Sequence, residues 1–222
     1  MNNKIIALLG AFIALFMLAG CTAHNESYDY TAFKESNPTS ILVLLPINQS
    51  TEINASYGVL SQITLPLAEA GYYVFPVMVT DEVFKQNGLT VASDIQAVSL
   101  PKLQQTFNPD AVLYINIQNY GTNYQLIQSD TRVTLEAKLL DSRTAKVIWT
   151  GSATASSLEN QQSSSNSLLG MLISAAITQI SDTVRDRSVA ISSVASARLF
   201  TPNPIKSDGI LYGPYAKNKQ SN

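Results

Sequence analysis

Residues that commonly perform catalysis are scarce in this chain. Its 222 residues include one cysteine, Cys21, and one histidine, His24, and both lie near the N-terminus. The rest of the sequence therefore has no disulfide, no cysteine or histidine ligand for a metal, and no Ser-His-Asp or Cys-His arrangement. A Gly-x-Ser-x-Gly motif and a phosphate-binding Gly-Lys-Ser/Thr loop are also missing. We predict that the protein is not an enzyme and has no catalytic residue, no metal site and no cofactor.

Charged residues are few as well. The chain has 14 basic and 16 acidic residues and a net charge of −2, which excludes the basic surface that a nucleic-acid partner needs. Two catalytic alternatives stay open: a serine–lysine pair with Lys85 or Lys102, and a pair of carboxylates as in glycosidases. The available acids form no recognisable motif; they are Glu69, Asp81, Glu82, Asp94, Asp110, Glu136 and Asp141.

The N-terminus does carry a clear signal. Lys4 precedes an apolar run from Ile5 to Ala19, and this run is shorter than the roughly twenty residues that span a membrane. The sequence Ala19-Gly20-Cys21 is typical of a bacterial lipoprotein signal cleaved between Gly20 and Cys21. Cys21 is then expected to carry a diacylglycerol and an N-acyl chain, which form a durable membrane anchor. Because Thr22 rather than an aspartate follows, we predict the outer membrane, with the body facing the periplasm.

Two alternatives to this signal are an uncleaved anchor and a secreted protein with a free cysteine.

The sequence pattern after Cys21 predicts the domain boundaries. Residues 21–40 are polar and unpatterned, which predicts a lipidated tether. We therefore predict a signal peptide at 1–20, a tether at 21–40, one α/β domain at 41–200 and an irregular C-terminal tail at 201–222.

Apolar patterns predict the fold class. The continuous apolar run at 41–47 is typical of a strand buried on both faces, and the alternation at 132–139 is typical of a strand with one exposed face. Further strands are expected at 72–78, 111–118 and 147–151, and helices at 56–70, 80–88 and 93–107, with a break at Pro101. We predict an α/β single domain with a mixed sheet of about five strands. Its order is β-α-β-α-β followed by an antiparallel hairpin, covered by helices.

A long C-terminal helix is expected from Leu168 to about Val194. One stripe of this helix is apolar, and the opposite stripe consists of small residues, among them Ser174 and Thr178. The helix is either buried against the sheet or presents Ser174 and Thr178 to a partner, since small residues allow a close approach. Two segments, 48–54 and 119–124, are predicted as docking loops, with Tyr120 and Tyr124 as contact residues or as strand-end packing.

Several strings resemble a known bacterial lipoprotein family, called domain of unknown function 799. They are Pro66-Leu-Ala-Glu69, Gly71-Tyr-Tyr-Val-Phe-Pro76, Asn87-Gly-Leu89, Asp110-Ala-Val-Leu-Tyr-Ile115, the hairpin at 141–149 and Leu211-Tyr-Gly-Pro-Tyr215. The resemblance implies an outer-membrane lipoprotein with a domain similar to the N-terminal domain of TolB. It also implies envelope lipoproteins as partners, among them one similar to the curli secretion channel. It implies no catalytic residue.

These observations favour a non-catalytic interaction module, an accessory subunit of an envelope or curli-secretion-like complex. A second copy of the chain is an alternative partner. Two other functions stay open: a periplasmic carrier of a lipid or cell-wall fragment, and a structural envelope lipoprotein.

Overall fold

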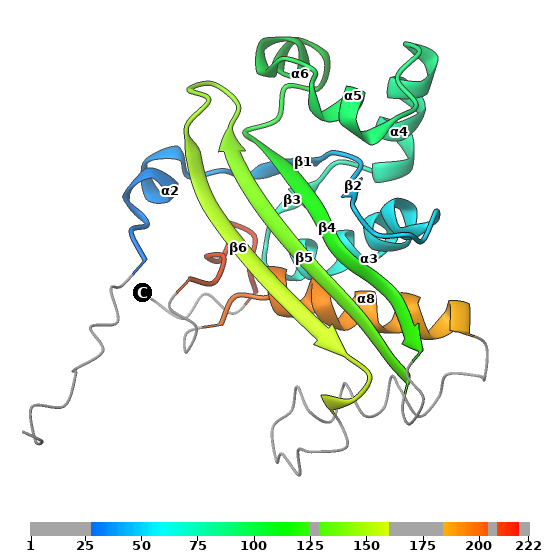
Figure 1. Cartoon of the computed structure of the whole chain (residues 1–222). Coiled ribbons are helices and arrows are strands. Elements are labelled where there is room, and N and C mark those ends of the chain that lie inside the picture. The colour runs from blue at the N-terminus through cyan, green and yellow to red at the C-terminus, as the bar shows by residue number, and fades with distance from the viewer. Residues whose placement is uncertain (1–27, 125–128, 160–183, 204–207, 218–222) are drawn as a thin grey trace, which may run out of the picture.

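A twisted mixed sheet forms the centre of the computed structural model, which describes residues 28–124, 129–159, 184–203 and 208–217 (Figure 1). The strand order is β3-β1-β4-β5-β6, and β2 also pairs with β4. The strands are β1 (Ser40–Val43), β2 (Ile47–Asn48), β3 (Tyr73–Val74), β4 (Ala111–Tyr124), β5 (Ser129–Asp141) and β6 (Val147–Ser156). The α/β fold predicted from the sequence, including its final antiparallel hairpin, is confirmed.

The parallel half of the sheet consists of β3, β1, β2 and the first part of β4. All side chains from Ile41 to Leu45 are buried, as expected for a central parallel strand. One face is closed by α5 (Ala92–Gln96), where Gln96 donates hydrogen bonds to the carbonyls of Leu45 and Ile115. The edge strand β3 is shorter than predicted, because Pro76 has no N–H to donate and α4 (Val77–Gln86) begins directly after it.

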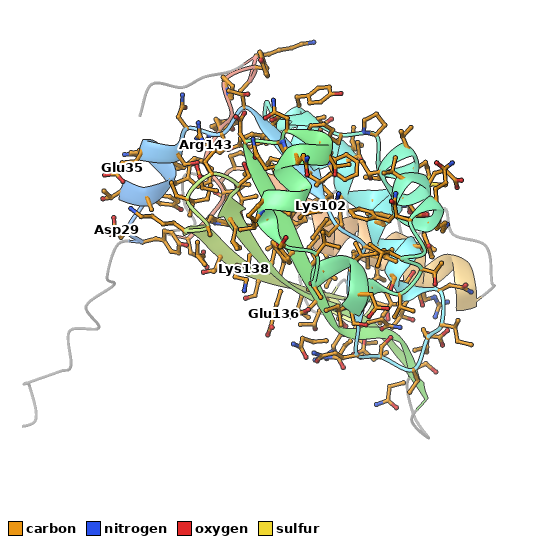
Figure 2. All side chains as sticks on the ribbon, turned by 90° about the horizontal axis from the view of Figure 1, so that it is seen from above. Asp29, Glu35, Lys102, Glu136, Lys138 and Arg143 are labelled. Carbon is orange, nitrogen blue, oxygen red and sulfur yellow. The ribbon has the colours of Figure 1, made fainter. Side chains whose placement is uncertain are left out.

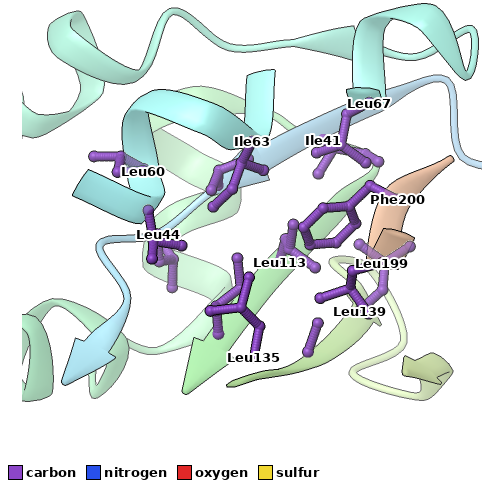
Figure 3. Close-up of a cluster of buried hydrophobic side chains, with 14 of the residues drawn as sticks. Ile41, Leu44, Leu60, Ile63, Leu67, Leu113, Leu135, Leu139, Leu199 and Phe200 are labelled. Carbon is purple, nitrogen blue, oxygen red and sulfur yellow. The ribbon is translucent and has the colours of Figure 1, made fainter. Parts of the chain in front are cut away.

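The opposite face is covered by two long helices, α3 (Ala55–Glu69) and α8 (Val184–Phe200). Figure 3 shows how leucine and isoleucine side chains from α3 meet those of β1 and β4, while Leu199 and Phe200 of α8 lie against β5. The prediction that Pro101 divides a helical segment is confirmed by α5 and α6 (Leu100–Phe107). The described helices include none that is both long and apolar enough to cross a membrane.

The antiparallel half has one buried and one exposed face. Val133, Leu135 and Leu139 of β5 are fully buried under α8, whereas Arg132 is exposed on the other side. Trp149 of β6 is fully buried, and its ring lies 6.1 Å from that of Phe200. The described part of the predicted C-terminal helix is therefore a core element; residues 160–183, including Ser174 and Thr178, lie outside the described residues.

The N-terminal residues 28–40 belong to the folded domain, which corrects the predicted tether boundary at residue 40. They form the short helix α2 (Thr31–Ser36), and Phe33 is only 4% exposed. The side chain of Ser36 donates a 2.6 Å hydrogen bond to Asp141 at the end of β5. This segment is held by one buried ring and by contacts to residues far along the chain. Its sequence therefore needs no periodic pattern of apolar residues, and none was there to predict its folding.

Candidate functional site

The two segments predicted as separate docking loops lie side by side in the structure. The loop at 49–52 follows β2, and the N–H of Gln49 donates to the carbonyl of Ile117 in β4. Residues 119–124 are a strand rather than a loop, because pairing with β5 resumes after a register shift between Ile117 and Asn119. Together with Asp130 and Arg132 of β5 they surround an open groove of about 670 Å³, here called the polar groove.

Amide, hydroxyl and charged side chains dominate the polar groove. It is lined by Gln49, Ser50, Thr51, Glu52, Gln118, Asn119, Tyr120, Gly121, Thr122, Asn123, Asp130 and Arg132. Asn48 fixes the loop: its Oδ1 accepts from Ser50, and its Nδ2 donates to the carbonyl of Glu52. On the β5 side, Arg132 donates to Asp130 at 2.9 Å. These groups offer hydrogen-bond donors and acceptors, and no cluster of metal ligands is found among the described residues.

Tyr120 borders the groove, but its ring packs against the helices. A Cβ placed on Gly58 of α3 would lie 2.5 Å from the Tyr120 hydroxyl, so α3 can pass this close only with glycine there. Burial raises the pKa of Tyr120, and a hydrogen bond with Ser192 of α8 acts against that shift. The contacts with α3 and α8 fit the packing alternative for Tyr120, and its role as a partner contact stays a prediction. The side chain of Tyr124 and the whole of Gly20 and Cys21 lie outside the part of the chain that the structure describes.

Three of the acidic residues left open for catalysis have structural partners. Asp81 forms a 2.6 Å ion pair with Lys85. Lys85 is the lysine of one of the serine–lysine alternatives, and this ion pair gives it a structural partner. Asp110 accepts four hydrogen bonds from the backbone and side chains of Thr39 and Ser40. Burial alone would raise the pKa of Asp110, but these hydrogen bonds outweigh it, and the pKa is lowered. The Asp110 carboxylate thus holds the start of β1 beside the start of β4 and remains ionised at neutral pH.

Asp141 has the same role at the end of β5. Its carboxylate accepts from Ser36 of α2, from the backbone and side chain of Thr144, and from Arg143, which is 3.0 Å away. Burial would raise the pKa of Asp141, yet the hydrogen bonds from Ser36, Arg143 and Thr144 lower it well below its usual range. Both acids therefore fasten residues 28–40 to the sheet.

The exposed face of the antiparallel strands forms a second, smaller groove of about 550 Å³. Tyr114 and Lys138 line it, and the Lys138 ammonium lies 5.9 Å from the centre of the Tyr114 ring. Figure 2 shows Glu136 and Lys138 on this face, on the side of the sheet that also carries Lys102 of α6. Tyr28 closes the groove at the β6 edge.

Comparison with known proteins assigns the family. The sequence profile of the family described as "Putative lipoprotein GNA1162-like" matches residues 28–215. This chain belongs to the GNA1162-like lipoprotein family. It is 47% identical over 208 residues to "Putative lipoprotein NMB1124/NMB1162" of Neisseria meningitidis serogroup B, covering 93% of this chain and 95% of that protein.

A solved member of the family has the same fold. The crystal structure of lipoprotein GNA1162 from Neisseria meningitidis is 50% identical and superimposes with a TM-score of 0.54, covering 66% of this chain and all of that one. The predicted resemblance to a lipoprotein family is thereby confirmed. The family name given from the sequence, and the likeness to TolB, stay predictions.

Two of the motifs that suggested a family touch each other in this GNA1162-like chain. The C-terminal Leu211–Tyr215 string lies on the turn at Gly71, where the N–H of Gly213 donates to Ala70 and that of Tyr215 donates to Gly71. The Tyr72 hydroxyl donates to the carbonyl of Leu211 at 2.5 Å. The described part of the predicted tail is therefore irregular in backbone but docked on the domain.

Proposed function

We propose that this lipoprotein is a non-catalytic interaction module that is held on the periplasmic face of the outer membrane by acylated Cys21 and docks an envelope partner in the polar groove. The proposal rests on one observation: the 49–52 loop and residues 118–123 of β4 line the same solvent-open groove. Its amides and hydroxyls suit a hydrogen-bonded interface with bridging waters, like the polar part of transient interfaces.

The partner proposed is another envelope lipoprotein, such as one similar to the curli secretion channel, with the protein as an accessory subunit. A second copy of this chain is the other protein partner to distinguish. The lipid-carrier alternative receives less support, because a lipid chain needs an enclosed apolar cavity, whereas the polar groove and the groove beside Tyr114 are open and carry polar side chains. A structural lipoprotein without a discrete partner remains the second alternative.

Cross-linking in cells, followed by pull-down in mild detergent, tests the proposal. Thr51→Arg and Asn119→Arg place a bulky charge in the groove at exposed positions. Gln105→Arg makes the same change on the exposed face of α6 and is the matched control. Emission of the buried Trp149 verifies that each variant is folded.

The wild type and Gln105→Arg should recover a stoichiometric partner, which the groove variants lose. Cys21→Ser should weaken recovery, because an unanchored protein is no longer concentrated at the membrane. Equal recovery by both groove variants would exclude the polar groove as the docking site. Recovery of the protein alone with co-purifying lipid would favour the carrier.

A further inference from the structure

The point where the tether meets the domain is fixed by side-chain contacts. The backbone N–H of Thr150 in β6 donates a 2.8 Å hydrogen bond to the hydroxyl of Tyr28. The rings of Tyr28 and Tyr30 lie 4.7 Å apart, and the Tyr30 hydroxyl donates to the carbonyl of Gly209. With Phe33 buried behind them, Tyr28 is fixed to the folded domain.

Few residues therefore separate Cys21 from a fixed point of the domain. Tyr28 follows Cys21 by seven residues, so that even a fully extended chain spans only about 25 Å. A domain of roughly 160 residues is about 40 Å across, from the usual relation between length and radius of gyration. A tether ending at residue 40 would have reached about 65 Å and allowed any orientation. The actual tether cannot pass around the domain, so Tyr28 cannot lie on the side away from the membrane.

The polar groove lies far from Tyr28 on the sheet. Thr150 pairs with Lys138, and Lys138 pairs with Tyr114, so Tyr28 is level with Tyr114 of β4. The groove extends from Gln118 to Asn123, four to nine residues further along that strand, or about 13 to 30 Å. It spans β4 from the 49–52 loop to Asp130 and Arg132 of β5, whereas Tyr28 contacts β6 at the edge of the sheet (Figure 1).

We propose that the anchored domain stands with its β6 edge and α2 facing the lipid surface, and that the polar groove is thereby turned toward the periplasm. The inference rests on the acylation of Cys21 in the proposed function. Figure 2 places Asp29, Glu35 and Arg143 at this membrane-facing end. Because the described residues at this end carry both acidic and basic side chains and no large patch of one sign, the tether length rather than charge sets the orientation, which should not depend on salt.

Single cysteines test the orientation in the full-length, lipidated protein. After lipidation the chain has no other free thiol, so Asp29→Cys and Asn123→Cys each give one labelling site at an exposed position. The labelled proteins are placed on phosphatidylethanolamine–phosphatidylglycerol vesicles that contain headgroup quenchers. The label at residue 29 should be quenched, and the label at residue 123 should keep its emission at both low and high salt.

A longer tether is the control. Inserting about twenty Gly/Ser residues between Ala23 and His24 frees the domain to turn and should remove the difference between the two labels. Equal quenching at both sites with the natural tether would overturn the orientation while leaving the anchor intact. Failure of the protein to float with the vesicles would instead overturn the anchor in the proposed function, and the orientation with it.

Discussion

Replacing Gly71 by alanine is expected to detach the C-terminal segment from the domain. Gly71 has φ +94°, and a Cβ there would lie 2.2 Å from the backbone nitrogen of Ala216. The neighbouring atoms are backbone, so relief requires the whole segment to move. That movement breaks the hydrogen bonds that Gly213 and Tyr215 donate and exposes Ile210, which is 2% exposed in the folded protein.

The magnitude follows from these losses. Left-handed backbone costs an alanine about 1 to 2 kcal/mol. Each lost backbone hydrogen bond costs about 1 kcal/mol, and exposing an isoleucine costs about 2 kcal/mol. Gly71→Ala should therefore lower the free energy of unfolding by about 5 to 6 kcal/mol, which corresponds to a fall in Tm of about 15 °C in a domain of this size.

Gly88→Ala separates backbone strain from the lost contact. Gly88 also has a positive φ, +79°, but a Cβ added there would have nothing within 4 Å. Only the strain of about 1 to 2 kcal/mol remains, so its Tm should fall by about 4 °C. Thermal unfolding followed by Trp149 emission measures both variants, and limited proteolysis detects release of the C-terminal segment. Equal Tm values, with the C-terminus equally protected, would refute the docking argument.

Three further outcomes are expected. Tyr120→Phe should cost about 1 kcal/mol in urea unfolding, through the lost hydrogen bond to Ser192, and should leave partner recovery unchanged. Phe33→Ala should cost about 3 kcal/mol and make residues 28–40 sensitive to protease. Because the pKa of Asp110 is lowered in the folded protein, its stabilisation is present above the unfolded value near about 4 and lost as the pH falls below it. Asp110→Asn should flatten the acid part of the pH–stability curve.

The sheet could be predicted because its signals are local. The apolar run at 41–47 reports burial on both faces, and the alternation at 132–139 reports one exposed face. The predicted ends of elements were less accurate where a single residue, such as Pro76, stops the pairing of a strand. The strand predicted at 72–78 ends at Val74, and α4 begins at Val77.

The two segments that form the candidate site could be predicted from the sequence, but their contact could not. Each of the two segments that line the polar groove is polar and was expected to be a docking loop. Their contact depends on the parallel pairing of β2 with β4, which joins residues almost seventy positions apart. Asp130 was not singled out, and Arg132 was seen only as part of an exposed strand face, because its place beside the groove follows from the register of β5 against β4.

The segment at 28–40 escaped prediction for a related reason. Its attachments join positions 71 and 105 residues apart, through single side chains such as those of Thr39 and Ser36. Yet this attachment sets how far an acylated Cys21 lets the protein reach. Seven residues of extended chain add about 25 Å to a domain about 40 Å across, so a groove on a domain anchored through Cys21 stays within about 65 Å of the bilayer. In the proposed arrangement, a partner must therefore come within this distance of the membrane that carries the anchor to enter the polar groove.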